Sequence, residues 1–482
     1  MVVVSNMEVD IHPVVVNNME VDIHPVVISD ANKEEEKVQT NWSTNIVYST
    51  NVLHEVKSVE EIQALMKSPE IEKVTMAGTC HTFNFIADNL HNRLSLKLMN
   101  GVVDLNESAR TVTVEAGIRY DQLCPYLESK GYALHNLASL TELSIAGAIS
   151  TSVHGSGNRN RNLATSVSAL EMVVANGDIV KLSRHSDGDV FLGAVVGLGA
   201  LGAITRITLD IEPAFTMRQH VYENLSLAVV KDNFDEIMGS GYSVSLFTNW
   251  QEKCYELWIK LIDENIDENI DKEDAEKCPN EGRKCSSTAF SRTRPPPQEL
   301  FGAQLQTENL NLVQGMPPEN CTEQMGVSGP SYQRLPHFRA GSLPNVGEEL
   351  QTEYFVPRHH AAAALLAMEN LKDQLTPLLL ESEIRTIAKD DLWMSMCYGR
   401  DSVAIHFCWI PDWPAVEKVL PVVENALKPY DPRPHWGKLF AMSPAELRSK
   451  YEKFEDFVKL AEKFDPQGKF RNEFLNTNVF SR

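Results

Sequence analysis

The sequence contains no hydrophobic run long enough to span a membrane, and its first residues lack the basic start and long apolar stretch of a secretion signal. It is also poor in positive charge: 44 lysines and arginines stand against 66 aspartates and glutamates, a formal net charge of -22. Proteins that bind nucleic acids or anionic membranes need basic patches. We therefore expect a soluble chain, cytoplasmic rather than secreted, whose partner is a neutral or cationic small molecule and not a nucleic acid.

Cysteine is sparse as well, with eight residues scattered through 482 positions and no spacing typical of metal ligands. This distribution predicts reduced thiols rather than a disulfide framework, and no metal site. A chain of this length with 43% hydrophobic residues can bury a large core but is too long for one compact domain. Two domains are the expectation.

Two segments have the composition of unfolded chain. Residues 1–40 hold one twelve-residue phrase twice, with the same nine residues beginning at Met7 and at Met19. Two copies are too few to bury a face as a solenoid does, so we predict a disordered, duplicated extension. Residues 262–300 combine a repeated acidic phrase with a polar, proline-rich run, which predicts a mobile insertion.

Capping signals indicate three helices. Ser58 begins a short amphipathic helix, and a second helix over Tyr120–Lys130 is closed by Gly131. Near the C-terminus, Ser443 begins one helix that runs to about Phe464.

Alternating apolar residues indicate strands between these helices. Leu94, Leu96 and Leu98 alternate with polar residues, and Asn176-Gly177 indicates an antiparallel hairpin. The run Gly197–Gly202 matches the dinucleotide-binding pattern GxGxxG, but it continues into a period-two segment where that pattern needs a helix. The sequence therefore predicts an α+β fold of helices and antiparallel strands, and not a doubly wound one.

The run Ala77-Gly78-Thr79-Cys80-His81-Thr82 follows a strand-like segment, residues 73–76. Small residues let the backbone approach a ligand closely, and successive N–H groups can point at a diphosphate. Taken alone, such a run is as often a plain loop with a solvated imidazole. Its interpretation depends on a second stretch farther along the chain.

That second stretch contains residues 136–140 and then the run 144–157, which ends in His-Gly-Ser-Gly. Together the two stretches resemble the flavin domain of the vanillyl-alcohol-oxidase family, in which one loop holds the FAD diphosphate and the glycine-rich run lines the isoalloxazine. The resemblance implies a two-part FAD-binding domain and a substrate (cap) domain on an antiparallel sheet flanked by helices. The cofactor contacts that it implies are Ala77, Gly78, Thr79, Cys80, His81, Thr82, Ser139, Ser144, Gly147, Thr151, His154, Gly155, Ile204 and His435.

The segment from Gly78 to Asp88 is similar to the one whose histidine is bonded to the flavin 8α-methyl group in alditol oxidases and sugar-lactone oxidases. His81 is the matching residue, so the resemblance implies covalently bound FAD. The expected boundaries are an FAD-binding domain over residues 41–215, a substrate domain over 216–430, and a C-terminal segment over 431–482 that returns to the flavin.

Two expected strands in the second domain carry polar pairs. Residues two apart on a strand lie on the same face, so Glu383 shares a face with Arg385, and His406 shares a face with Cys408. The residues on the opposite face of the second strand are apolar. A surface ion pair and a core histidine are the alternative interpretations. Two polar pairs in one domain, on strands whose opposite faces are apolar, favour a polar surface that binds a ligand.

A further motif, residues 434–438, is similar to the His-Trp-x-Lys element of sugar-lactone and alditol oxidases. With it, the chain from residue 41 to 474 resembles the alditol oxidases. The resemblance implies a substrate pocket of Ser139, Glu383, Arg385, His406, Cys408 and Lys438, with cysteine where that family often has threonine.

Three functions follow from this resemblance. The first is an FAD-dependent oxidase that converts the terminal alcohol of an alditol, such as xylitol, sorbitol or mannitol, to the aldose and reduces O2 to hydrogen peroxide. The alternatives are a sugar-1,4-lactone oxidase and a catalytically silent flavin-binding protein. In the first, Arg385 and Lys438 stabilise the developing alkoxide, Glu383 orients the arginine, and His406 or else Lys438 is the base.

Overall fold

The computed structural model describes residues 39–263, 295–342 and 348–481. Nearly all of the duplicated extension and most of the acidic insertion lie outside the described residues. Residues 38–482 form one compact unit, and the predicted domain boundaries within it stay a prediction.

The first part of this unit contains two main sheets. A three-stranded parallel sheet has the order β1-β3-β2, and a five-stranded antiparallel sheet has the order β4-β5-β9-β7-β8. Two further strands, β6 and β10, pair with each other. The bounds of the strands are β1 (Leu53–Glu55), β2 (Thr75–Ala77), β3 (Arg93–Ser95), β4 (Val102–Asn106), β5 (Thr111–Glu115), β6 (Tyr132–Ala133), β7 (Val167–Val173), β8 (Ile179–Ser183), β9 (Ala203–Asp210) and β10 (Glu212–Pro213).

The alternation predicted from Leu94 to Leu98 is wrong in one respect. Strand β3 ends at Ser95, all three of its residues are buried, and Leu98 lies past its end with 44% of its surface exposed. The strand is the middle one of a parallel sheet, and such strands are covered on both faces, so they do not alternate. This small sheet is also an exception to the predicted antiparallel pairing.

The predicted hairpin at Asn176-Gly177 is confirmed. Strands β7 and β8 pair antiparallel, and Gly177 has a φ of +84°, which a residue with a side chain rarely adopts. The run Gly197–Gly202 leads into strand β9, so the context excludes the dinucleotide pattern as expected.

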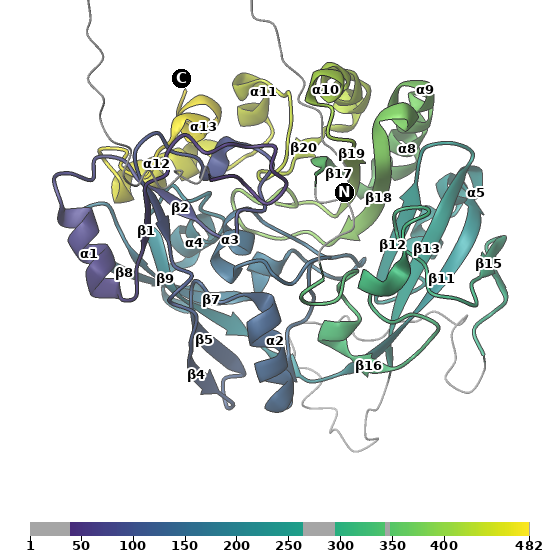
Figure 1. Ribbon diagram of the computed structural model, residues 1–482, viewed down its shortest axis with the longest axis horizontal. Coiled ribbons are helices and arrows are strands. Elements are labelled where there is room, and N and C mark those ends of the chain that lie inside the picture. The colour runs from purple at the N-terminus through teal and green to yellow at the C-terminus, as the bar shows by residue number, and fades with distance from the viewer. Residues whose placement is uncertain (1–38, 264–294, 343–347, 482) are drawn as a thin grey trace, which may run out of the picture. The chain divides into compact units, whose positions relative to one another are not determined.

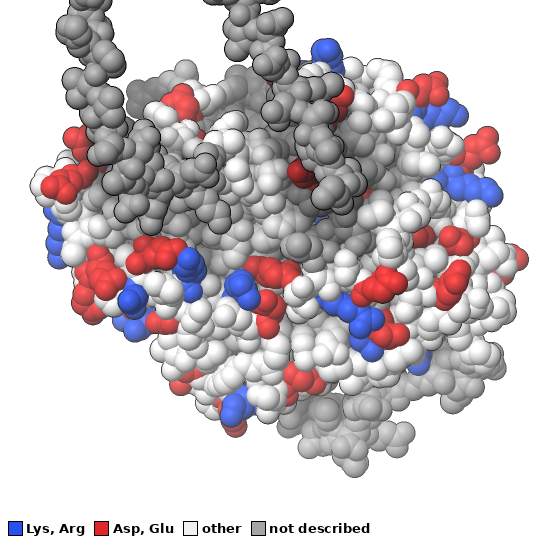
Figure 2. Space-filling view, in the orientation of Figure 1, with Lys and Arg blue, Asp and Glu red and all other residues white. Residues whose placement is uncertain are grey.

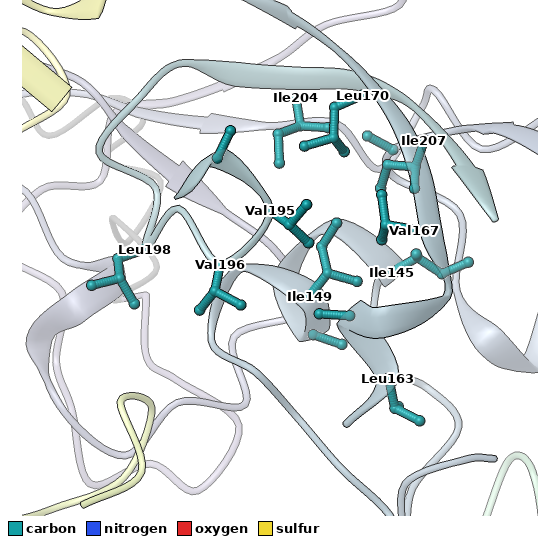
Figure 3. Packing of buried hydrophobic residues seen from close by; sticks show 14 of the residues in the cluster. Ile145, Ile149, Leu163, Val167, Leu170, Val195, Val196, Leu198, Ile204 and Ile207 are labelled. Carbon is teal, nitrogen blue, oxygen red and sulfur yellow. The ribbon is translucent and has the colours of Figure 1, made fainter. Parts of the chain in front are cut away.

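Helices α1, α2, α3 and α4 complete the first part, and apolar side chains from them and from the five-stranded sheet form one core. Figure 3 shows 14 of these side chains, and those it labels come from α3, α4, β7, β9 and the segments between them. Ser58 accepts a hydrogen bond at the start of α1, as predicted. The bounds are α1 (Val59–Lys67), α2 (Tyr120–Ser129), α3 (Ile145–Ser150) and α4 (Arg184–Val195).

The second part is built on a ten-stranded antiparallel sheet, counted over the described residues. Its order is β14-β15-β11-β13-β12-β18-β19-β17-β20, with β16 beside β11 (Figure 1). The bounds are β11 (Thr216–Ser226), β12 (Ser243–Thr248), β13 (Lys253–Asp263), β14 (Glu299–Leu300), β15 (Ala303–Leu305), β16 (Gly329–Pro330), β17 (Leu350–Pro357), β18 (Leu379–Ile387), β19 (Ser402–Trp409) and β20 (Arg433–Pro434).

One face of this sheet is apolar and packs against helices. On β19 the side chains of Val403, Ile405, Phe407 and Trp409 lie in a second core together with residues of α5, α8 and α10, as the alternation predicts. The opposite face is therefore free to carry polar groups. The helices are α5 (Leu227–Asp232), α6 (Phe234–Met238), α8 (Ala361–Glu369), α9 (Lys372–Leu375) and α10 (Trp413–Leu427).

The C-terminal segment returns to the first part of the unit. Figure 1 shows the yellow helices α12 (Phe454–Phe464) and α13 (Glu473–Leu475) beside the purple and blue elements. The side-chain amide of Asn472 donates to the carbonyl groups of Phe85, Ile86 and Asp88 at distances of 2.8 to 3.2 Å. The single helix predicted from Ser443 is wrong, because the chain forms α11 (Pro444–Ser449) and α12 with a break between them.

Candidate active site

A cavity of about 320 Å³ lies between the loop 77–82, the run 138–154, strands β17 to β19 and the loop 435–438. All the predicted site residues except one line it. The exception is Gly155, where an added Cβ would lie 2.4 Å from the carbonyl oxygen of Leu137. Gly155 therefore serves close packing of the run against the loop before it.

Small residues bring two segments of the cavity wall together. A Cβ at Gly78 would lie 2.8 Å from Oγ of Ser144, and a Cβ at Gly147 would lie 2.9 Å from the same atom. The hydroxyl oxygen of Thr82, on the same loop, is buried without a hydrogen-bond partner among the described residues. Close backbone approach and an unpaired polar atom fit a bound phosphate-bearing cofactor.

His81 lies at the edge of this cradle. Its ring stacks on Trp42 with the ring centroids 5.4 Å apart, and its Nδ1 lies 3.0 Å from Oγ1 of Thr79. Burial lowers the pKa of His81 to about 4, so the imidazole is neutral near pH 7. A neutral, oriented ring nitrogen is the form that can carry a covalent bond to a ligand.

The loop 435–438 is tied directly to the cradle. The backbone N–H of Phe83 donates to the carbonyl of Gly437 at 2.8 Å, and the side-chain amide of Asn84 donates to the carbonyls of Trp436 and Lys438. The backbone N–H of His435 in turn donates to the carbonyl of Glu353 on β17. This loop thereby joins the cradle to the ten-stranded sheet and places Lys438 between them.

The polar face of the sheet forms the opposite wall. The strand register puts Glu383, His406 and Glu353 in one row across β18, β19 and β17, and Glu381, Cys408 and Gln351 in the next row. All six line the cavity. The surface ion pair considered for Glu383 and Arg385 is excluded, because both side chains are buried.

Glu353 is the most connected group of the wall. Its carboxylate lies 2.8 Å from Nζ of Lys438, 3.0 Å from Nη2 of Arg385 and 3.2 Å from Nε2 of His154. Burial alone would raise the pKa of Glu353, but the charges of Lys438 and Arg385 outweigh it and hold the pKa well below 4.5. Two cations of the cavity lining are thereby held against the same carboxylate.

A second chain of contacts runs from Arg385 along the cavity wall through Glu383 and His337 to Lys260. Nε of Arg385 lies 3.4 Å from Glu383, whose other oxygen lies 2.8 Å from Nε2 of His337. Nδ1 of His337 lies 3.2 Å from Nζ of Lys260, which also donates to the carbonyls of Leu335 and Pro336. Below about pH 7, where Lys260 is protonated, its ammonium can only donate and so fixes the histidine tautomer that donates to Glu383.

His406 is buried and faces Glu381, with 3.3 Å between Nδ1 and the carboxyl oxygen. Burial and the charge of Lys438 lower the pKa of His406 well below 6.5, so its imidazole is neutral. Burial and the charge of Glu383 raise the pKa of Glu381 well above 4.5. Cation contacts therefore favour ionised glutamates in one row, whereas burial favours the protonated carboxyl group in the next row.

Several residues of the site were missing from the sequence-based set. Glu353, which contacts both Arg385 and Lys438, was not predicted. Glu381, His337 and Lys260 were not predicted either. Gln351 and Glu353 alternate on β17, and Glu349 directly precedes that strand in the same period, which is the signal that could have revealed a polar face there. The contacts of His337 and Lys260 bridge 77 positions and leave no such pattern.

Three further expectations concern nucleic acids, membranes and metal ions. On the face shown in Figure 2, lysine and arginine side chains are interspersed with acidic ones instead of forming one basic patch. None of the helices in the described part is long and apolar enough to cross a membrane. No cluster of three metal-ligating side chains occurs among residues 39–263, 295–342 and 348–481.

Comparison with known proteins finds two family models that match separate segments of the chain. Residues 50–183 match the family model described as an FAD binding domain, and residues 347–478 match the one for D-arabinono-1,4-lactone oxidase. Among solved structures, a cholesterol oxidase from B. sterolicum superimposes with a TM-score of 0.72 at 14% identity, over 92% of this chain and 96% of that one. The chain is thus a flavoprotein with an FAD-binding domain, as predicted, and the predicted fold class is confirmed.

Curated relatives narrow the family. Alditol oxidase of a Streptomyces species is 40% identical over 445 residues, which are 90% of this chain and 97% of the relative. L-gulono-1,4-lactone dehydrogenase of Mycobacterium tuberculosis is 26% identical over 84% of this chain and 89% of the relative. The chain belongs to the alditol oxidase family.

The buried ammonium of Lys260 yields a prediction about stability and pH. Burial lowers the pKa of Lys260 from 10.5 to about 7, so between these values the unfolded chain binds a proton that the folded chain does not. We expect this residue to make the free energy of unfolding rise with pH between about 7 and about 10.5. In urea unfolding from pH 6 to 10, Lys260→Met should remove this slope.

Lys231 provides the control, because its ammonium is paired with Glu369 on a neighbouring helix, away from the cavity. Lys231→Met should keep the slope of the wild-type protein. Parallel curves for the wild-type protein and Lys260→Met above pH 7 would contradict the prediction.

Proposed function

We propose that the protein is an FAD-dependent alditol oxidase. A terminal CH2–OH group loses its hydroxyl proton and a hydride to become an aldehyde, and O2 takes up the two electrons and two protons as hydrogen peroxide. The observation that supports this most directly is that Arg385 and Lys438, which both line the cavity, contact the same carboxylate, that of Glu353. FAD, when bound, supplies the hydride acceptor.

The residues of the wall have distinct roles in this proposal. The N–H groups of Arg385 and Lys438 stabilise negative charge on the substrate oxygen as its proton leaves. Glu353 and Glu383 hold both cations in place, and Ser139, whose Oγ lies 3.5 Å from Nη1 of Arg385, borders the same space. His406 is neutral and lines the cavity, so it can accept the proton.

The cofactor contacts remain those that the sequence predicts. The loop 77–82 with Ser144 and Gly147 would hold the diphosphate, His154 and His435 would border the ring system, and Ile204 would lie farther along the cavity. We propose that the bond to FAD is covalent and runs through His81.

The sugar-lactone oxidase remains the second candidate, because residues 347–478 match a lactone oxidase model. Peroxide production measured with a series of alditols and a series of sugar-1,4-lactones separates the two. We expect turnover with alditols of five and six carbons and little with lactones. The opposite ranking would favour the lactone oxidase, and yellow protein inactive on both series would favour a silent flavoprotein.

The covalent link has its own test. Wild-type protein precipitated with acid should retain its yellow colour in the pellet, and His81→Ala should release the flavin into the supernatant. Trp42→Phe is the control, because it keeps an aromatic ring against His81 without touching the bond. Release of flavin from the denatured wild-type protein would show that the link is absent.

The assignment of the base predicts a pH profile. Because the pKa of His406 lies well below 6.5, kcat/KM of the wild-type enzyme should rise with pH on the acid side and level off before neutrality. Lys438→Met and Arg385→Met should lower turnover by about 10²–10³ while FAD stays bound. His406→Ala should abolish the acid-side rise. If the rise survives in His406→Ala and disappears in Lys438→Met, the base is the lysine.

A further inference from the structure

One carboxyl oxygen in the cavity wall has no hydrogen-bond partner among the described residues. It is Oε2 of Glu381, whose side chain lines the cavity and is only 4% exposed. The nearby Nδ1 of His406 also lacks a hydrogen-bond partner in the part of the chain that the structure describes. Buried polar atoms in folded proteins are almost always paired, so an unpaired one that faces a cavity indicates a ligand group.

The cations of the wall are paired with other carboxylates, and their charges lower the pKa of Glu381 less than burial raises it. Lys438 is paired with Glu353, and Arg385 is paired with Glu353 and Glu383. Across the residues that the structure describes, Glu381 forms no ion pair with a lysine or an arginine, and its one charged-group contact is His406. A group that completes its hydrogen bonding must therefore come from the content of the cavity.

The position of Glu381 on β18 indicates which part of a substrate it meets. Ile387, at the end of β18, pairs with Gly157, next to the run that lines the flavin side of the cavity. From there the cavity-facing side chains are Arg385, Glu383 and Glu381, spaced by about 6.8 Å. Glu381 thus lies one row beyond the residues assigned to the reacting hydroxyl group, away from the flavin side.

We propose that Glu381 is a specificity-determining residue, whose carboxyl group binds a hydroxyl group of the polyol remote from the carbon that is oxidised. This inference rests on the proposed function and defines its substrate class as alditols long enough to reach this row. A hydroxyl group both donates and accepts, and a protonated carboxyl group does the same. The raised pKa of Glu381 supports that form.

The neighbour of Glu381 fits this assignment. Cys408 opposes Glu381 across the two strands, and burial raises the pKa of its thiol well above 9.0, so it is an uncharged, weak hydrogen-bonding group. Glu381 is then the strong hydrogen-bonding group of this row. A threonine at position 408 would add a second one.

The test compares alditols of three to six carbons. In the wild-type enzyme kcat/KM should increase with chain length. In Glu381→Leu it should fall by about tenfold or more for the five- and six-carbon alditols and by less than about twofold for glycerol, because glycerol does not reach the row. Glu381→Gln should retain most of the wild-type profile, since an amide also donates and accepts.

Glu256→Gln is the matched control. Glu256 is another buried glutamate of the same sheet, but its carboxyl group is hydrogen-bonded to the indole of Trp258 and lies outside the cavity lining. This variant should keep the length profile. Flavin absorbance per protein should be the same in all variants, which separates folding from specificity.

A binding measurement completes the test. Xylitol should raise the melting temperature of the wild-type protein and of Glu381→Gln more than that of Glu381→Leu. An unchanged length profile in Glu381→Leu, or an equal loss for glycerol and xylitol, would overturn the inference while leaving the proposed function intact. A wild-type protein that oxidises no alditol would overturn both.

Discussion

The carboxylate of Glu353 is the interaction on which the site depends. Arg385 lies on β18 and Lys438 on the C-terminal loop, and two buried cations so close together would repel each other without an anion between them. Glu353 on β17 supplies that anion and also faces His154 from the flavin-binding run. The side chain of Glu353 thus contacts groups from the sheet, from the C-terminal loop and from the first part of the unit, and its negative charge favours positive charge on each of them.

The same wall shifts the pKa values of its glutamates in opposite directions. Cation contacts lower the pKa of Glu353 and of Glu383, whereas burial raises the pKa of Glu381 and of Glu349 more than the charge of Lys438 lowers it. Identical side chains on neighbouring strands therefore differ in how readily they hold a negative charge. A polyol needs both kinds of group, because its reacting end develops charge while its other hydroxyl groups do not.

Much of this arrangement was predictable from the sequence, because local pattern determines it. The polar pairs on β18 and β19 follow from period-two alternation, and the cradle follows from the family resemblance of the loop 77–82 together with the run 144–157. The helix from Ser443 and the strand at Leu98 were wrong, since the break at 450–453 and the parallel middle strand depend on packing against distant segments. Glu353 was missed for a related reason: its partners lie 32 and 85 positions away along the chain.

The rigidity of the site follows from the apolar face of the sheet. Alternate residues of β19 are fixed in the second core, so the residues between them, His406 and Cys408, cannot shift by one position without moving four large apolar side chains into the cavity. The cradle is fixed separately, through hydrogen bonds from Phe83 and Asn84 to the loop 435–438. Because that loop also carries Lys438, the cation that contacts Glu353 is positioned by the same bonds that position the predicted flavin attachment loop.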